Sequence, residues 1–486
     1  MIGLGKDYRQ NVALMDDVLR VQENFDVIKK VMCLGKDEIT LYYIDGFVDS
    51  GSMNKMMIYF LSLKSLGTPS DSGEDAAARY FCRHHLPHVE AEVSADADML
   101  VHMVLSGTTL ILGATFGPYG IVVDSRTYPT RSVEEPESDR VMLGSRDGFV
   151  ETLVFNTALI RRRVRDPQLT MQYYSIGERS RTDVVLCYLE GQADPGYVKH
   201  LQARLRAIRT RALTMGHESL AELLIRDKWY NPFPKIRYTE RPDVAAAQVM
   251  EGSVLIVVDN SPEVMIFPST IFDFMQESND FYFPPLTGSY IRLVRYLVFL
   301  ATLLLTPAWF LLTKNPALAP DWLQFVLPES TGKISIFAQL LLVEFVIDGL
   351  RMASMNTPSM LSNSLSVVGG LILGDFAVDI GWLIPEVILY MAFVAIANFS
   401  QRSYQLGYAF KFMRIGLLIC VQLLDGVGFL LGFGVCILLL ATNKTANGRR
   451  SYLYPLIPFH PRALYTMLLR ARKGRVPEED GIRRKK

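Results

Sequence analysis

The feature that most constrains the fold is a change in composition near residue 290. From Ile291 to Ala441 the chain consists largely of apolar runs long enough to enter a bilayer, whereas the residues before Tyr290 are rich in charge. Half of all residues are hydrophobic, and the mean hydropathy is positive. The sequence therefore predicts a globular N-terminal region followed by an α-helical polytopic membrane domain.

The globular region alternates strand and helix patterns, which predicts two small α/β units. We expect the first cytoplasmic unit over residues 1–140 and the second over residues 141–288. A transmembrane helical domain is expected over residues 289–442, followed by a basic cytoplasmic tail over residues 443–486. Residues 1–30 are predicted to begin the chain as an amphipathic helix. The expected strands include EITLYYIDGFVD, TTLILGATF, GIVVDS, DVVLCYLEG and SVLIVVDN.

The globular region contains no motif of a known catalytic class. It lacks GxxxxGK[ST], GxSxG and HExxH, the signatures of phosphate-binding loops, α/β-hydrolases and zinc proteases. The segment CRHHLPHVE gathers Cys82, His84, His85, His88 and Glu90, but their spacing matches no standard zinc site. We therefore expect a solvated loop there, no bound metal, no cofactor and no enzymatic activity.

Charge and cysteine content give no indication of nucleic-acid binding or of a disulfide framework. Fifty basic and fifty acidic residues leave no net charge, so nothing indicates nucleic-acid binding. The five cysteines are odd in number and scattered, without a CxxC pair, which favours reduced thiols over a disulfide framework. The run Arg161–Arg163 predicts a salt-bridged helix surface, because three consecutive arginines on a helix point in different directions.

Positive charge sets the expected topology of the apolar half. Arg292 and Arg295 precede the core of the first span, and the tail from Arg449 is basic, so both termini are predicted on the cytoplasmic side. The last apolar run, FMRIGLLICVQLLDGVGFLLGFGVCILLLA, counts as one span in this scheme. Five crossings would then place the tail outside. We therefore predict four crossings, with the segment 361–384 re-entrant or half-spanning.

Charged residues inside apolar segments are the main candidates for function. In LLVEFVIDGLRMAS, Glu344, Asp348 and Arg351 are spaced by four and three residues, which places them on one side of a helix. Two roles are open. Arg351 can pair with Asp348 as a structural latch, with Glu344 pairing across a subunit boundary. Alternatively, the stripe faces an aqueous lumen in which Glu344 is a cation site.

Two further patterns lie in the same half. Asp375 and Asp379 are four apart in a segment rich in glycine, which makes them candidates for an ion path. Asp379 can equally lie at the membrane interface near Trp382. Two GxxxG pairs predict close helix packing, within one chain or between subunits. The glycines concerned are Gly370, Gly374, Gly428 and Gly432.

Three long stretches carry a resemblance to a known family. They are LGSRDGFVETLVFNTALIRRRVRDPQL, NPFPKIRYTERPDVAAAQVMEGSVLIVVDNSPEVMIFPSTIFDFMQ and LLVEFVIDGLRMAS. In order and spacing they resemble the A subunits of GerA-type spore germinant receptors, from about Tyr42 to about Leu440. The stretches LLTKNPALAPDWLQFVLP and VVGGLILGDFAVDIGWL look closest to a stage V sporulation branch of that family.

The resemblance implies a polytopic protein of the inner spore membrane that acts in germination. It implies an oligomeric cation channel subunit that promotes ion release beside a second membrane protein of the germination machinery. A non-conducting scaffold that docks other germination proteins is the alternative. Because the family keeps acids at the positions of Glu344 and Asp348 and arginine at that of Arg351, we expect Arg351 to be a latch and Glu344 a pathway residue.

Overall fold

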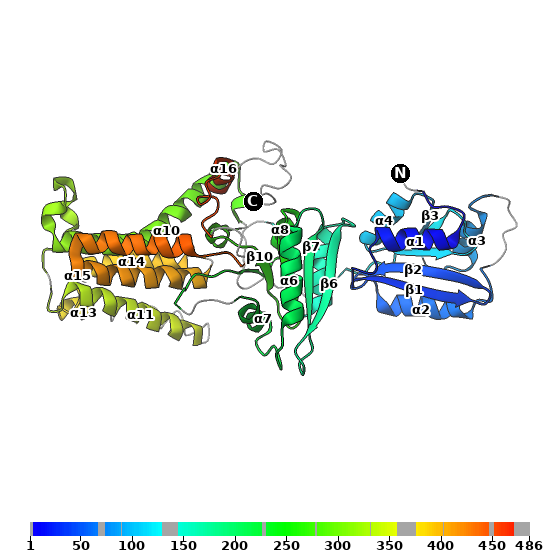
Figure 1. The fold of residues 1–486 in the computed structure, drawn as a ribbon, viewed down its shortest axis with the longest axis horizontal. Coiled ribbons are helices and arrows are strands. Elements are labelled where there is room, and N and C mark those ends of the chain that lie inside the picture. The colour runs from blue at the N-terminus through cyan, green and yellow to red at the C-terminus, as the bar shows by residue number, and fades with distance from the viewer. Residues whose placement is uncertain are drawn as a thin grey trace. The chain divides into compact units, whose positions relative to one another are not determined.

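The computed structural model describes residues 3–66, 73–88, 90–128, 144–225, 230–277, 279–330, 332–356, 376–401, 403–446 and 452–470. These residues form two compact units (Figure 1). The first contains the described residues up to 225 together with 236–268, and the second contains 230–235 together with 269–470. The first unit is α/β and the second is helical. The predicted succession of an α/β region and a helical region is therefore confirmed.

Two five-stranded sheets form the first unit, and their strand pairings are antiparallel. The first sheet has the order β1-β2-β4-β5-β3 and the second the order β6-β7-β9-β10-β8. The first contains β1 (Val27–Leu34), β2 (Asp37–Ile44), β3 (Ala91–Ser94), β4 (Thr109–Gly113) and β5 (Gly120–Val123). The second contains β6 (Leu169–Ile176), β7 (Thr182–Leu189), β8 (Arg237–Thr239), β9 (Val254–Val258) and β10 (Val264–Phe267).

Helices cover both faces of the first sheet, as Figure 1 shows. Helices α1 (Tyr8–Val18) and α4 (Ala97–Leu105) lie on one face, and α2 (Ser50–Ser62) and α3 (Ala76–His84) on the other. Alternate residues of β2 point to opposite faces: Tyr42 packs with the first pair of helices, and Leu41 packs with the second. Burial on both faces explains why the central strands are almost continuously apolar.

The second sheet is covered in the same way. Helices α5 (Leu153–Arg163) and α8 (Pro242–Met250) pack on the face that carries Val185 and Cys187. Helix α6 (Pro195–Ala207) packs against β6, and α7 (Gly216–Leu224) packs against β9. Pro242 and Pro195 each occupy the first turn of their helix, where a missing N–H costs nothing.

The predicted helical start over residues 1–30 is wrong in its second half. Helix α1 ends at Val18, and β1 begins at Val27 and pairs along its whole length with β2. In the sequence, Lys29 and Lys30 interrupt the apolar residues by which this strand could have been predicted. Charged side chains of this kind are common on edge strands, and β1 lies at the edge of its sheet.

Arg161 is fully buried, so the predicted salt-bridged surface is wrong for this residue. Its Nε and Nη2 atoms donate to the two carboxylate oxygens of Asp26 at 2.8 and 2.9 Å, and Nη1 donates to the carbonyl oxygen of Leu169 at 3.1 Å. This bidentate pair joins α5 to the residue that precedes β1. Arg163 does form an ion pair nearer the surface, with Asp147 at 2.5 Å.

The second unit is built mainly from four apolar helices. They are α10 (Pro285–Lys314), α11 (Ile336–Asn356), α14 (Pro385–Phe399) and α15 (Tyr404–Thr442). Shorter elements are η1 (Ile271–Phe274), α9 (Asn279–Tyr282), η2 (Pro316–Leu318), η3 (Asp321–Val326), α13 (Ala377–Asp379) and α16 (Pro461–Leu468). Within the described residues, α10 and α15 have the length and apolar composition of membrane-spanning helices.

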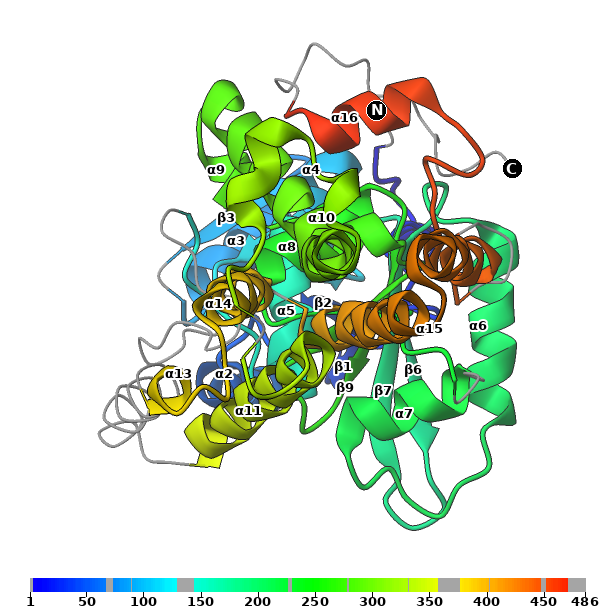
Figure 2. The same cartoon turned by 90° about the vertical axis from the view of Figure 1, so that its left-hand side faces the viewer.

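Helix α15 folds back on itself at Asp425. This residue has φ 51° and ψ −130°, which is not helical. A Cβ on Gly432 would lie 2.7 Å from Cδ1 of Leu417, although residues fifteen apart in a straight helix are separated by about 22 Å. Gly428 similarly abuts the carbonyl oxygen of Cys420. The two halves of α15 are therefore antiparallel and side by side (Figures 1 and 2).

This hairpin corrects the predicted course of the last apolar run. The run forms two antiparallel helices, not one. The prediction for the segment 361–384 depended on counting this run as a single span, and that assumption is wrong. Residues 361–375 of that segment lie outside the described residues. The fold-back places Gly428 and Gly432 against the other half of their own helix. In this chain, those two glycines serve intrachain packing.

Both ends of the helical unit lie at the same end of the bundle. Arg292, near the start of α10, donates from Nη1 to the carbonyl oxygens of Thr466 at 3.1 Å and of Met467 at 3.0 Å. Helices α11 and α14 run in the same direction, because Gln339 accepts from the backbone N–H of Ile384 at 2.9 Å and Arg351 lies over the ring of Phe399.

The five cysteines are free thiols, and burial predicts how differently they react. Burial raises the pKa of Cys187 to about 12 and that of Cys82 to about 11, whereas Cys33 is exposed. Since the thiolate is the nucleophile, maleimide should label Cys33 quickly and Cys187 only after unfolding. Mass spectrometry should find all five labelled in denaturant without reductant. A cysteine that reacts only after reduction would contradict the assignment.

The hairpin predicts opposite effects for two glycines of α15. A Cβ at Gly428 would clash with the carbonyl oxygen of Cys420, whereas a Cβ at Gly434 has no neighbour within 4 Å. Gly428→Ala should lower the thermal midpoint of the detergent-solubilised protein. Gly434→Ala should leave it unchanged or raise it slightly, because alanine favours a helix over glycine. Equal effects of the two changes would contradict the fold-back.

Candidate functional site: a charge network inside the helical unit

Glu344 is the central acid of the helical unit. It lies in the middle of α11, and only 3% of its surface is exposed. An unpaired carboxylate in such a position would be strongly unfavourable. Its partner is Arg414 in the first half of α15, which donates from Nε to Glu344 Oε1 at 2.6 Å and approaches the same oxygen with Nη2.

Arg414 connects three helices. The residue is fully buried, and its Nη1 donates to the carbonyl oxygen of Thr302 in α10 at 2.9 Å. Phe299, one turn earlier in α10, packs edge-on against Phe410 with ring centroids 4.7 Å apart. One guanidinium group thus fixes the rotation of α10, α11 and α15 about their axes.

Lys411 lies one turn before Arg414 and completes the set of charges. Its Nζ forms an ion pair with Asp348, lies 3.4 Å from Glu344 Oε2, and donates to the backbone carbonyl of Glu344 at 3.3 Å. We call Glu344, Asp348, Lys411 and Arg414 the charge network. It contains two acids and two bases, so its formal charge is zero and each charge has an opposite neighbour.

Arg351 contacts aromatic rings one turn further along α11. Its guanidinium lies 4.6 Å from the ring centroid of Tyr404, 5.1 Å from that of Tyr408 and 5.5 Å from that of Phe399. Stacking of this kind stabilises a cation where water is scarce. The ion pair that the structure gives to Asp348 is with Lys411, which corrects the predicted latch between Asp348 and Arg351.

A small cavity lies beside the network, between α11, α14 and α15. Its polar lining comes from Glu344, Asp348, Arg351, Asn398, Tyr408 and Lys411. Glu344, Asp348 and Arg351 therefore do face one common space, as their spacing in the sequence predicts. The side chain of Asp348 is 30% exposed, against 5% for Glu344. Asp348 is thus the acid of the network that is more open to solvent.

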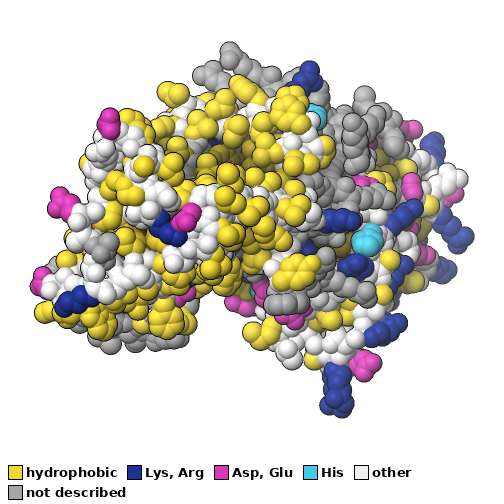
Figure 3. Space-filling view, turned by 60° about the vertical axis from the view of Figure 1, so that its left-hand side comes forward, with side chains coloured by type: hydrophobic (Ala, Val, Ile, Leu, Met, Phe, Trp, Pro, Cys, Tyr) yellow, Lys and Arg dark blue, Asp and Glu magenta, His cyan; other side chains and the backbone are white. Residues whose placement is uncertain are grey.

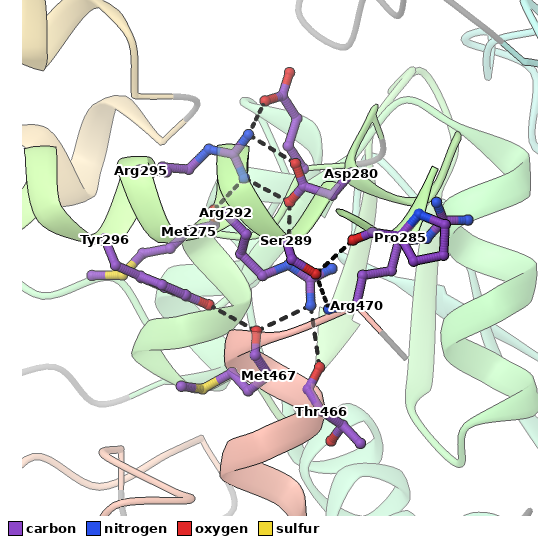
Figure 4. Close-up of polar contacts among 11 residues, drawn as sticks. Met275, Asp280, Pro285, Ser289, Arg292, Arg295, Tyr296, Thr466, Met467 and Arg470 are labelled. Atoms are coloured by element: carbon purple, nitrogen blue, oxygen red, sulfur yellow. Dashed lines mark hydrogen bonds and ion pairs between the residues drawn. The ribbon is translucent and has the colours of Figure 1, made fainter. Parts of the chain in front are cut away.

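A second polar cluster surrounds the start of α10 (Figure 4). Arg295 pairs with Asp280 at 2.7 Å and with Glu277 at 2.6 Å. Arg292 lies 3.5 Å from the same Asp280, which is fully buried. The two arginines that set the predicted orientation are therefore engaged in ion pairs and hydrogen bonds within the chain.

The other sequence candidates lie elsewhere or outside the described residues. Asp379 ends the short helix α13 and is exposed. Asp375, Gly370 and Gly374 are not among the described residues. Within the described part of the chain, no three His, Cys, Asp or Glu side chains are arranged to hold a metal ion.

Sequence reasoning missed both bases of the network. A signal was available, because Lys411 and Arg414 stand three apart at the start of the last apolar run. Two acids inside one apolar helix require compensating charge, and these are the bases that a neighbouring apolar helix offers. The hairpin also had a signal. As a single helix, the apolar run over residues 412–441 would measure about 45 Å, about one and a half times the hydrocarbon thickness of a bilayer.

Comparison with known proteins places the chain in a family. A model described as the Bacillus/Clostridium GerA spore germination protein matches residues 17–478. The chain belongs to the GerA family. It is 38% identical over 451 residues to stage V sporulation protein AF of Bacillus subtilis, covering 93% of this chain and 90% of that protein. It is 27% identical over 488 residues to spore germination protein B1 of the same species, covering 96% and 99%.

A solved structure is also similar. The N-terminal domain of the A subunit of the Bacillus megaterium spore germinant receptor GerK3 matches with 24% identity and a TM-score of 0.41, over 55% of this chain and 96% of that one. The predicted resemblance to GerA-type proteins, and to stage V sporulation protein AF among them, is confirmed by the family match and its relatives.

The charge network predicts how its members respond to substitution. Arg414→Ala leaves Glu344 buried without its partner and should lower stability by about 3–5 kcal/mol, whereas Arg414→Met combined with Glu344→Leu should recover most of it. The fraction of monodisperse protein after heating in detergent measures both. Glu344→Gln should also reduce folded protein, because a neutral amide cannot replace the carboxylate. A double variant no more stable than Arg414→Ala would contradict the pairing.

Proposed function

We propose that this protein is a multi-pass protein of the inner spore membrane whose copies assemble into a cation-conducting complex that promotes ion release in germination. The observation that carries the membrane part is the distribution of side chains in the helical unit. Glu344, Lys411 and Arg414 lie buried between helices, whereas many large apolar side chains are exposed along the bundle. In Figure 3 hydrophobic side chains cover most of the visible face of this unit. Family membership carries the part in germination.

Exposed aromatic residues support the proposed membrane position. At one end of the bundle they are Trp322, Phe325 and Trp382, and at the other they are Tyr290, Phe399 and Tyr404. Between the two groups, the second half of α15 exposes a row of large apolar residues that includes Leu430, Leu431 and Leu438. Aromatic belts at both interfaces with an aliphatic band between them are typical of membrane proteins. We assign both termini to the cytoplasmic side of the membrane, which is the core side in a spore.

An ion path is proposed between copies of the chain, with a second membrane protein of the germination machinery as a further partner. Within one chain Glu344 is buried and paired with Arg414, so we now assign it a structural role. Asp379 is exposed and remains a candidate for attracting cations, as acidic rings do in cation channels. Asp348 is the second candidate, because its carboxylate is partly exposed at the cavity.

A non-conducting scaffold is the alternative function. One observation favours it: the four charges of the network neutralise one another within a single chain. Such a network leaves no spare charge for an ion and needs no second copy. In this case the α/β unit and the helical unit would dock other germination proteins. In both proposals the protein is not an enzyme, and its relatives bear the names of germination and sporulation proteins.

Ion flux separates the two proposals. Purified protein in liposomes loaded with K⁺ should release the ion, and Asp379→Asn should slow the release while the protein remains folded. Asp321→Asn is the matched control, since Asp321 is also an exposed acid of the helical unit. Absence of release from correctly folded protein would favour the scaffold. Equal effects of the two substitutions would remove Asp379 from the ion path.

A further inference from the structure

One end of the second sheet carries a basic surface. Five exposed arginines stand in the β6–β7 hairpin, near the end of α6 and in the loop that follows α6, namely Arg179, Arg181, Arg206, Arg209 and Arg211. Backbone hydrogen bonds hold the hairpin against this loop. The N–H of Glu178 donates to the carbonyl of Thr210 at 3.0 Å, and that of Arg179 donates to the carbonyl of Arg211 at 2.9 Å. We call the five arginines the arginine surface.

The arginine surface has little compensating charge nearby. Glu178 is the one acid of segments 177–181 and 206–211, so the five arginines leave a formal charge of +4. Asp183 follows in β7, where its carboxylate accepts from the hydroxyl of Tyr173 at 2.6 Å. Among the described residues, none of the five arginines forms an ion pair. Since like charges held close together repel, this surface is suited to an anionic partner.

An acidic surface lies at an edge of the first sheet. Strand β3 is the last strand of that sheet, and its neighbour there is β5. Residues 90–98 contain four acids and no Lys or Arg, namely Glu90, Glu92, Asp96 and Asp98. All four acids are exposed. None of them forms an ion pair within the described part of the chain. We call these four residues the acidic edge.

The position of the arginine surface favours a protein partner over lipid headgroups. The β6–β7 hairpin, between Ile176 and Thr182, lies at one end of the second sheet, whereas β8 begins at Arg237 and β10 ends at Phe267 at the other end. The chain passes between the two units just before β8 and just after β10. The arginines therefore lie at the end of the sheet away from both connections to the apolar helices.

We propose that the arginine surface of one copy of this chain binds the acidic edge of a second copy. Charge complementarity carries the proposal, because five exposed arginines would face four exposed acids. Guanidinium groups bind carboxylates through paired hydrogen bonds, and opposite charges across an interface determine which surfaces meet. Since the two surfaces differ, the contact is heterologous and can repeat from copy to copy. The inference rests on the proposed assembly of copies.

Charge reversal in the full-length, detergent-solubilised protein tests this contact. Arg179→Glu combined with Arg211→Glu reverses the arginine surface, and Glu90→Lys combined with Glu92→Lys reverses the acidic edge. Each pair should weaken association at least about a hundredfold, because like charges then face one another across the interface. Size-exclusion chromatography with light scattering measures the oligomer mass against protein concentration. High salt should weaken the wild-type contact as well.

Mixing the two reversed proteins separates this contact from a general loss of structure. An equimolar mixture should associate as the wild type does, because in it each arginine or lysine surface can again meet an acidic one. Lys36→Glu combined with Lys55→Glu is the matched control. These two exposed bases stand beside β1, at the opposite edge of the first sheet from β3, and their reversal should leave the oligomer mass unchanged.

The outcomes distinguish this inference from the proposed function. Unchanged association of either reversed protein would overturn this inference alone, and the arginine surface would then be left to another anionic partner. A mixture that fails to reassociate, from variants that keep the wild-type thermal midpoint, would overturn it equally. Wild-type protein that stays monomeric at low salt would overturn the proposed assembly of copies as well.

Discussion

Neutralisation of charge inside an apolar bundle is the constraint on which the helical unit depends. Glu344 and Arg414 are both buried, and neither is stable there without the other. Because Arg414 also binds the carbonyl of Thr302, the pair sets the relative rotation of three helices at once. Apolar packing alone would specify this rotation weakly, since one aliphatic side chain can replace another. The network therefore contributes specificity as well as stability, and a shift of one helical turn would separate the charges.

The positions of the charges along each helix could be predicted, but their pairing could not. A period of 3.6 residues places Glu344, Asp348 and Arg351 on one side, and the structure shows them lining one cavity. The choice of Lys411 as partner for Asp348 depends on which helix packs beside α11. That choice is a tertiary contact between residues 63 apart in sequence, and the local pattern favoured the nearer Arg351 instead.

Hydropathy alone predicted neither the hairpin of α15 nor the strand β1. The apolar run that contains Asp425 and Gly426 averages to one strong signal, although an Asp–Gly pair is a turn pattern. Strand β1 was not predicted because Lys29 and Lys30 interrupt its apolar residues. The buried strands were well predicted, because β2, β4, β5, β7 and β9 are short apolar runs bounded by turn residues, whereas the order of the strands in each sheet was not predicted. Local patterns succeeded where a strand is buried on both faces, and they failed at a sheet edge and at a helix reversal.

The asymmetry of the α15 hairpin has a consequence for how the chain is made. Residues 426–442 contain no charged side chain, whereas the half before Asp425 carries Lys411 and Arg414. Helix α11 leaves the ribosome first, and Lys411 follows Glu344 by 67 residues. At typical rates of synthesis this interval is roughly 3–13 s. During that time the acids of α11 have no basic partner from α15, so a stable bundle cannot close until the first half of α15 has emerged. The uncharged second half then packs against the first without needing a partner for any charge.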